Sequence, residues 1–144
     1  MKQYITDEKV FRFTRSLFGA QTDQPFEGDF TTTVLRHSDT GKWFGIVLDA
    51  PKNKVGVSGE GTVRVLNLKC DPLFADILFQ AYRGIVPAYH MNKRHWISVV
   101  LAGDVPWEEV ENCIRMSYAL TAKKQKKKTA ENPNKEARKA ISTR

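Results

Sequence analysis

The apolar residues of the chain change their spacing several times, and each change predicts a boundary between a helix and a strand. In residues 6–18 they recur at intervals of three and four, which is the spacing of an amphipathic helix. Thr6 or Asp7 can cap the start of this helix, and Gly19 is suited to its end. This segment is therefore predicted to be a helix that packs on a sheet.

Strand-like patterns follow, separated by polar segments with turn-forming residues. They are rich in β-branched residues or alternate apolar with polar positions, and they cover residues 32–36, 43–48, 54–58, 62–69 and 95–101. The connections between the first three are rich in turn residues, which predicts a hairpin meander. Residues 20–31 and 83–94 lack such a pattern and are predicted to be loops.

Two further helices are indicated by their start signals. Asp71 followed by Pro72 is a typical helix start, and the apolar spacing continues to about Tyr82. Pro106 opens the last helix, whose pattern reaches Leu120 and can continue beyond it. This order of elements predicts an α+β fold, an antiparallel sheet of about five strands packed by helices, and residues 1–122 are expected to form a single domain.

The composition is that of a folded protein. With 144 residues, of which 41% are hydrophobic, the chain is long enough to bury a core. No apolar run approaches the roughly 20 residues that a membrane span needs, and residues 1–8 lack the apolar region of a signal peptide. We therefore expect a cytoplasmic protein that has no membrane partner.

The net charge of +7 comes from one end of the chain. Residues 123–144 contain nine of the 23 Lys and Arg residues and two of the 16 Asp and Glu residues, which leaves 14 of each sign in residues 1–122. The segment 123–144 is predicted to be a basic tail, partly disordered or marginally helical. A basic face on the folded domain does not follow from the net charge, because the domain itself is neutral.

The sequence contains no nucleophile elbow, no phosphate-binding loop and no dinucleotide-binding fingerprint. Cys70 and Cys113 lie far apart and outside any Cys-x-x-Cys pair, so two buried reduced thiols are expected rather than a disulfide or a metal site. Cys70 precedes a predicted helix start, where a thiolate is favoured, but we expect it to be a core thiol. We therefore expect a protein that is not an enzyme and uses no cofactor or metal.

The segment His90–Trp96 concentrates two histidines, two cations and a tryptophan directly before a predicted strand. Two interpretations of it stay open. In the first, Trp96 belongs to the core, His95 donates to a backbone carbonyl, and the cations are solvated. In the second, Lys93 and Arg94 contact phosphates while an exposed His or Trp stacks on a base or lines a pocket.

Two other groups of cations are candidates for contacts with a nucleic acid. The first lies on or beside the predicted hairpin tips and comprises His37, Lys42, Lys52 and Lys54. Charged tips are also a common means of keeping a sheet soluble. The second is the lysine run of the tail, which comprises Lys123, Lys124, Lys126, Lys127 and Lys128. Such a run can bind any polyanion, and it can equally be a solvated tail that aids solubility.

With these residues in view, the chain resembles the MmcQ/YjbR family over roughly residues 7–121. The most specific part of the resemblance is the segment Tyr89–Trp96, which reads Tyr-His-Met-Asn-Lys-Arg-His-Trp. Weaker matches lie at Pro25–Phe26, Gly41–Phe44, Leu68–Pro72, Gly103–Pro106 and Ser117–Tyr118. The lysine-rich tail lies outside the resemblance.

The resemblance implies an α+β sandwich similar to that of CyaY and frataxin, and a DNA-binding role through a surface known as a double wing. A fold does not by itself determine a function. The iron binding of frataxin is not implied, because it depends on an acidic first helix. Residues 6–18 hold only Asp7 and Glu8 against three cations.

We therefore expect a small, non-enzymatic DNA-binding protein in which Lys93, Arg94 and His95 position the DNA together with the hairpin cations. The tail would add non-specific affinity. The alternative is a module that binds a protein or a small ligand in a groove beside His90–Trp96. The sequence does not determine the ligand or the oligomeric state.

Overall fold

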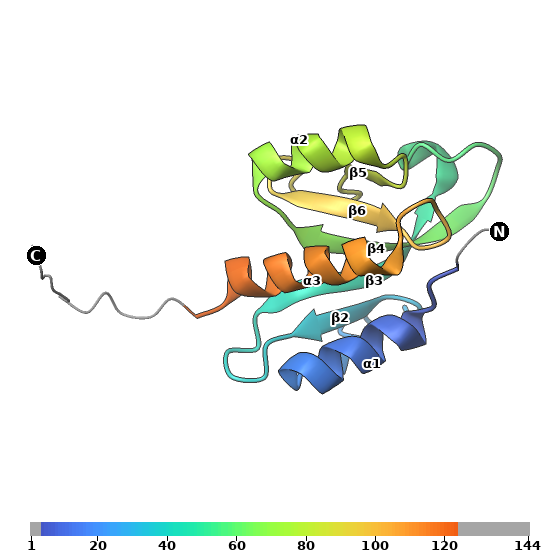
Figure 1. Cartoon of the computed structure of the whole chain (residues 1–144). Helices are drawn as coiled ribbons and strands as arrows, with labels where there is room; N and C mark the ends of the chain where they lie inside the picture. Colours follow the sequence, from blue (N-terminus) through green and yellow to red (C-terminus); the bar gives the residue numbers. More distant parts are fainter. Residues whose placement is uncertain (1–3, 124–144) are drawn as a thin grey trace, which may run out of the picture.

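The computed structural model describes residues 4–123 and contains one antiparallel sheet with helices on one side (Figure 1). The elements are α1 (Asp7–Phe18), β1 (Gln21–Asp23), β2 (Thr33–Arg36), β3 (Trp43–Pro51), a short 3-10 helix (Lys52–Lys54), β4 (Thr62–Lys69), α2 (Pro72–Ala81), β5 (Ile85–Pro87), β6 (Trp96–Val100) and α3 (Trp107–Thr121). The six strands are ordered β1-β2-β3-β4-β6-β5. This confirms the predicted α+β fold, with one strand more than expected.

The helix ends depend on capping residues that are visible in the sequence. Thr6 Oγ1 accepts a hydrogen bond from the amide of Lys9 (3.1 Å) at the start of α1. Gly19 has a φ of +65° and donates its amide to the carbonyl of Arg15 (2.9 Å) at the end of α1. Asp71 caps α2 through its side chain. Because these signals are local, α1 and α2 lie within a residue or so of their predicted bounds.

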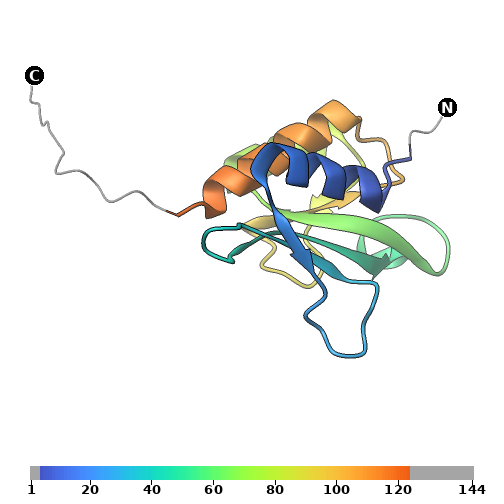
Figure 2. The ribbon, with the colours of Figure 1, turned by 90° about the horizontal axis from the view of Figure 1, so that it is seen from below.

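The helices all cover the same side of the sheet, which we call the helix side. α3 crosses the sheet over β3 and β4, α1 lies beside α3 next to β2, and α2 lies near β5 (Figures 1 and 2). The inward faces of the helices and of the strands form the main hydrophobic cluster, whose large buried members include Leu35, Phe44, Leu66, Leu68, Ile97 and Ile114.

The opposite side of the sheet, which we call the helix-free side, has a smaller hydrophobic cluster. Its buried members are Ala50, Val55, Val65 and Val100. The segment after β3 contributes Val57 to the edge of this cluster, and the segment after β5 contributes Tyr89. Two irregular segments therefore cover this part of the helix-free side, whereas helices cover the other side.

Three predicted elements differ from the structure. Residues 54–58 were predicted to be a strand but form the end of the 3-10 helix and a turn, in which Gly56 has a φ of +74°. Val55 and Val57, which alternate in this segment, pack on the smaller cluster and do not belong to a paired strand. The loops predicted at 20–31 and 83–94 each contain a three-residue edge strand. Neither edge strand is long enough to show a hydrophobic period.

A serine hydroxyl takes the place of a ladder hydrogen bond at one end of the sheet. The pairing of β3 with β4 ends at Gly45 and Leu68. Beyond that pair, Ser117 Oγ of α3 accepts from the amide of Lys69 (2.9 Å) and donates to the carbonyl of Phe44 (2.6 Å). These two bonds fix α3 to both strands. They also pair two backbone groups next to the fully buried Ser117, where an unpaired group would be costly.

His37 lies beside a hairpin turn, as predicted, but its side chain is buried. Its Nε2 lies 2.7 Å from Thr121 Oγ1, and its ring stacks on Tyr118 with the centroids 4.0 Å apart. Burial lowers the pKa of His37 below its usual value of 6.5. His37 therefore links the turn between β2 and β3 to the end of α3, and its ring is not available to a nucleic acid.

Within residues 4–123, no helix has the length and apolar character that crossing a membrane requires. The predicted basic tail beyond Lys123 lies outside the described residues.

Candidate functional site

Two buried polar side chains hold the segment between β5 and β6 on the helix-free side. Asn67 of β4 and Ser98 of β6 are partners in the sheet, and Ser98 Oγ donates to Asn67 Oδ1 (2.5 Å). Asn67 Nδ2 donates to the carbonyl of Tyr89 (2.8 Å), and the amide of Tyr89 donates to Ser98 Oγ (2.8 Å). This buried network fixes the backbone where the segment Tyr89–His95 begins.

The middle of this segment is an ordered turn. His90 has a φ of +65° and is the one residue other than glycine, among those described, in the left-handed region. Asn92 Oδ1 accepts hydrogen bonds from the amides of Arg94 (2.9 Å) and His95 (3.1 Å). The amide of His95 is therefore a donor to Asn92, while its ring is exposed.

An open hollow lies beside this turn. Its volume is about 580 Å³, and it is lined by Lys54, Tyr89, His90, Met91, Asn92 and Lys93. Lys54 comes from the segment between β3 and β4, so two segments remote in sequence bring their lysines together. Lys93 Nζ also donates to the carbonyl of Ala88 (2.7 Å). Because none of the described residues that line the hollow is a carboxylate, the two ammonium groups favour an anion such as a phosphate there.

The structure separates the other predicted cations. Arg94 and His95 are exposed on the same turn as Lys93, and Lys52 is half-buried in the 3-10 helix. Lys42 precedes the nine-residue strand β3, whereas the segment that carries Lys54 follows it. The two ends of such a strand are about 30 Å apart. One phosphate cannot contact both lysines.

Lys42 belongs instead to the end of the molecule where α3 stops. Its carbonyl accepts the amide of His37 (2.8 Å), whose ring contacts Thr121, and Lys123 follows two residues later. The other predicted tail residues, Lys124, Lys126, Lys127 and Lys128, lie outside the described residues. The described cations of the predicted site thus form two groups, one around the hollow and one at the end of α3.

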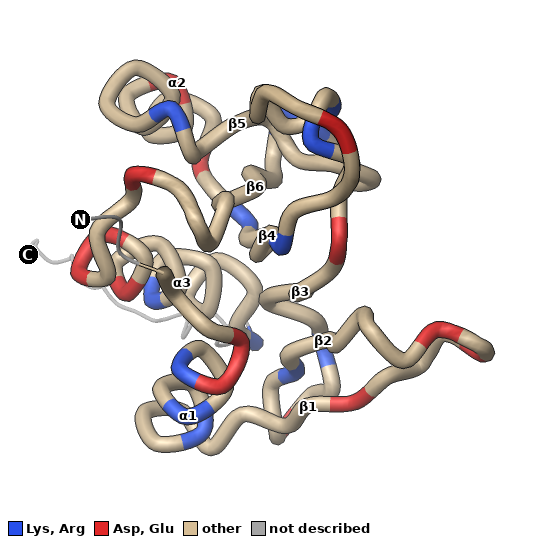
Figure 3. Tube along the Cα trace, turned by 90° about the vertical axis from the view of Figure 1, so that its right-hand side faces the viewer, with Lys and Arg blue, Asp and Glu red and all other residues tan. Residues whose placement is uncertain are grey.

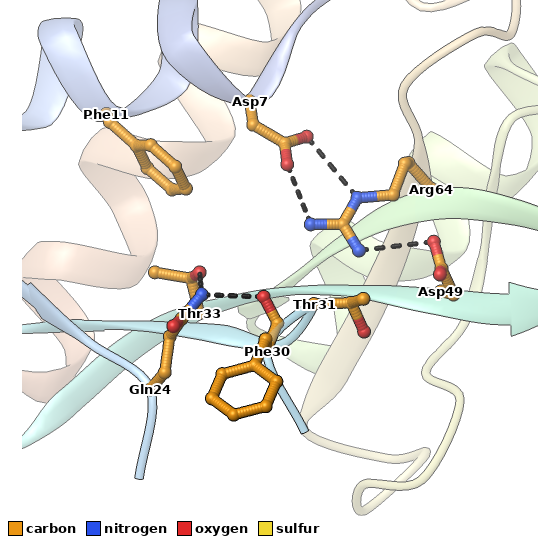
Figure 4. A pocket seen from close by; sticks show the side chains of 8 residues that line it. All are labelled: Asp7, Phe11, Gln24, Phe30, Thr31, Thr33, Asp49 and Arg64. Carbon is orange, nitrogen blue, oxygen red and sulfur yellow. Dashed lines mark hydrogen bonds and ion pairs between the residues drawn. The ribbon is translucent and has the colours of Figure 1, made fainter. Parts of the chain in front are cut away.

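A second hollow, which was not predicted from the sequence, lies between the start of α1 and the sheet (Figure 4). Arg64 of β4 is paired there with Asp7 (2.7 Å) and Asp49 (3.1 Å). The volume is about 440 Å³, and the other lining residues are Phe11, Gln24, Phe30, Thr31 and Thr33. Since two carboxylates already neutralise Arg64, this ion-pair group attaches α1 to the sheet and offers no free cation. Sequence reasoning missed it because its members meet only through the topology.

A loop of the opposite charge projects from the helix-free side. Residues 24–32 hold Glu27 and Asp29 and no Lys or Arg (Figure 3). Asp29 accepts hydrogen bonds from the side chains and amides of Thr32 and Thr31, and these bonds lower its pKa to about 2. The resulting turn holds Phe30 with 80% of its surface exposed.

The two cysteines are free and buried, as predicted. Burial raises the pKa of Cys70 to about 11 and that of Cys113 to about 12, so both thiols stay protonated near neutral pH. Among residues 4–123, no group of three or more His, Cys, Asp or Glu side chains is arranged to hold a metal ion.

The family model and the relatives that match this chain agree with one another. The family model described as YjbR matches residues 15–120. The uncharacterized protein YyaQ of Bacillus subtilis is 38% identical over 117 residues, which cover 81% of this chain and 98% of YyaQ. The uncharacterized protein YjbR of Escherichia coli K12 is 34% identical over 114 residues, which cover 79% of this chain and 85% of YjbR.

Solved structures show the same relationship. A crystal structure of a protein from Pseudomonas syringae matches with a TM-score of 0.76 and 35% identity, over 82% of this chain and all of that chain. A crystal structure of the Deinococcus radiodurans protein DR2400 matches with a TM-score of 0.65 and 27% identity, over 90% of this chain and 88% of that chain. Together with the match to the family model over most of the chain, these likenesses establish that the chain belongs to the YjbR family.

Proposed function

We propose that the protein is a non-enzymatic DNA-binding protein that contacts the phosphate backbone through Lys54 and Lys93. Arg94 and His95 lie beside them on the same turn. The observation that supports this most is the hollow lined by both lysines and His90, because no carboxylate of residues 4–123 lines it. Contacts from Lys and Arg to phosphates supply most of the sequence-independent affinity for DNA.

The placement of charge limits where the duplex can lie. The domain is neutral in total, so its cations matter only where they gather. On the helix-free side Lys54 and Lys93 meet at the hollow, whereas the charged residues of the loop 24–32 are both acidic. We therefore expect the basic turn to contact DNA and the acidic loop to avoid it. The cations near Lys42 and Lys123 would add contacts at the other end of the domain.

A pair of matched double variants tests this proposal. Lys54→Gln with Lys93→Gln removes the two lysines of the hollow, while Arg12→Gln with Arg15→Gln removes two exposed cations from α1. Fluorescence anisotropy with a labelled duplex measures the affinity over a range of salt concentrations. The first pair is expected to lower the magnitude of the slope of log K against log salt by about 2, and the second pair to leave it nearly unchanged.

An equal loss in both double variants would show that net charge alone attracts DNA and that the hollow has no role. The absence of binding by the full chain at low salt would refute the proposal entirely. Circular dichroism of both double variants controls for folding, and all four substituted positions are exposed, so we expect both to fold.

A second candidate function is the binding of a small anionic ligand in the same hollow. The volume of about 580 Å³ is within the range of small-molecule sites. Titration with inorganic phosphate and with a mononucleotide, followed by NMR at the amides of Tyr89–Lys93, distinguishes the two functions. Saturation at low ligand concentration without any duplex binding would favour the small-ligand function.

A further inference from the structure

A row of alternating cations and aromatic residues crosses four adjacent strands at one end of the sheet. Arg36 of β2 is the partner of Trp43 of β3, and Lys69 of β4 is the partner of Trp96 of β6. β3 and β4 are neighbours whose pairing ends at Gly45 and Leu68, so both pairs lie just beyond it, at the same end of the sheet. Two regular strand spacings correspond to about 10 Å, so the backbones of Trp43 and Trp96 are at least roughly that far apart.

All four side chains lie on the helix-free side. The strand neighbours Leu35, Leu68 and Ile97 belong to the cluster on the helix side, and side chains alternate between the two sides along a strand. Trp43 is on the same side as Arg36, because the guanidinium carbon of Arg36 lies 5.5 Å from the centre of the Trp43 ring. Within residues 4–123, no α-helix covers this side of the sheet (Figure 2).

The two tryptophans keep part of their surface exposed. Both are half-buried, and neither belongs to the hydrophobic clusters on the two sides of the sheet. For Trp96 this differs from the interpretation that places it in the core. Phe26 of the loop 24–32 packs perpendicular to the Trp43 ring, with the centroids 5.9 Å apart, and Arg36 is fixed by Asp23 at 2.9 Å. These contacts hold the Trp43 ring in place before any ligand arrives.

Cations accompany the aromatic residues along the row. Lys42 is exposed next to Trp43, and Arg94 is exposed close to Trp96, with Lys69 between the two tryptophans. The acidic loop 24–32 projects on the same side of the sheet, at the β1 edge (Figures 2 and 3). A polyanion is therefore attracted to the part of the row that runs from Lys42 to Arg94 and is repelled from the β1 edge.

We propose that this row is a stacking platform for unpaired bases, so that the protein binds single-stranded nucleic acid more tightly than duplex. The inference deepens the proposed function, on which it rests for the phosphate contacts. Proteins that bind single strands combine aromatic rings, on which bases stack, with cations that follow the backbone. In a duplex the faces of the bases are covered by their neighbours, so a platform of this kind can use them only in a single strand.

The test uses the full chain and three probes of equal phosphate number: an oligothymidylate, an abasic strand without bases, and a duplex. The basic tail and Lys93 can bind all three, whereas stacking requires bases that are free. We expect the oligothymidylate to bind at least about tenfold more tightly than the abasic strand. Trp43→Leu and Trp96→Leu are each expected to weaken oligothymidylate binding roughly fivefold to a hundredfold and to leave the abasic strand unaffected.

Conservative variants and fluorescence separate stacking from folding defects. Trp43→Phe and Trp96→Phe keep an aromatic face and are expected to restore most of the affinity for the oligothymidylate. In a Trp107→Phe background, which removes the tryptophan of the helix side, the oligothymidylate should quench the remaining fluorescence. Oligoribouridylate in place of oligothymidylate shows whether RNA or DNA is the preferred strand.

Equal affinity for the oligothymidylate and the abasic strand, or binding without quenching, would overturn the stacking platform. In that case duplex binding that still depends on Lys54 and Lys93 would leave the proposed function intact. If none of the three probes binds at low salt, the proposed function fails together with this inference.

Discussion

At the scale of single residues, a few polar side chains hold positions that no apolar residue could fill. Ser117 is such a residue, because its hydroxyl satisfies the amide of Lys69 and the carbonyl of Phe44 at once. Ser117→Ala leaves both backbone groups buried without a partner. We expect the free energy of unfolding to fall by about 2–4 kcal/mol, as each orphaned group costs about 1–3 kcal/mol.

Urea denaturation measures this loss, with Ser58→Ala as the control because Ser58 is exposed in a turn. The control is expected to change stability by less than about 0.5 kcal/mol. A loss for Ser117→Ala that is no larger than that of the control would show that water replaces the hydroxyl at no cost.

Asp29 gives a second prediction at this scale. Hydrogen bonds from Thr32 and Thr31 lower its pKa from 3.8 to about 2, so the carboxylate keeps its charge in moderate acid. A lowered pKa means that the turn is fully formed above about pH 4 and is lost as the pH falls through about 2. An NMR titration of the amides of Thr31 and Thr32 should show a midpoint near 2, and a midpoint near 3.8 would contradict the hydrogen-bond pattern.

At the scale of elements, His37 connects the turn between β2 and β3 to the end of α3. Burial is the main cause of its lowered pKa, Asp39 raises the pKa, and Lys42 lowers it. The unfolded chain therefore takes up a proton at a higher pH than the folded protein does. The free energy of unfolding is expected to be constant above about pH 6.5 and to decrease as the pH falls below that value.

The variant His37→Gln keeps a hydrogen-bonding group beside Thr121 but cannot titrate in this range. Urea unfolding measures the free energy of unfolding at one pH above 6.5 and one below it. The change in this free energy between the two pH values should be smaller for the variant than for the unchanged chain. If the two changes are equal, other groups control the pH dependence, and protonation of His37 does not lower the free energy of unfolding.

The elements also show which parts of the fold could be predicted. The helices α1 and α2 were predictable because Thr6, Gly19 and Asp71 act within a few residues of their own positions. The edge strands β1 and β5 were not, because three residues carry no hydrophobic period. The predicted strand at residues 54–58 was wrong because Val55 is buried by a turn that packs on the sheet and not by strand pairing.

Part of the candidate site could likewise be predicted from the sequence, and part could not. The segment His90–Trp96 was identified from its own composition, and the structure places Lys93 in the hollow. The meeting of Lys54 with Lys93 could not be predicted, because it depends on how two loops cross the helix-free side. The same holds for Arg64, whose partners Asp7 and Asp49 lie on two other elements.

At the scale of the whole molecule, the acidic loop should oppose the binding of any nucleic acid. Glu27 is exposed on this loop, and Glu27→Gln removes one negative charge without touching the Asp29 turn. We expect the affinity for a single strand to rise by up to about threefold at low salt and to be unchanged at high salt, since surface charges are screened. A matched change on the helix side, Glu108→Gln, should have a smaller effect. Equal effects would show that only the net charge matters.

The basic tail and the neutral domain are expected to contribute separably to binding. If the full chain neutralises about six phosphates of a duplex, log K should fall with log salt at a slope of about −5. A chain that ends at Lys123 lacks eight of the cations in the tail and keeps both groups of described cations. Its slope is expected to shrink to between about −2, if only the two lysines of the hollow contact phosphates, and about −4, if Lys42 and Lys123 add two contacts. Its preference for an oligothymidylate over an abasic strand is expected to stay the same. Loss of that preference together with the tail would mean that the tail, and not the sheet, distinguishes the two strands.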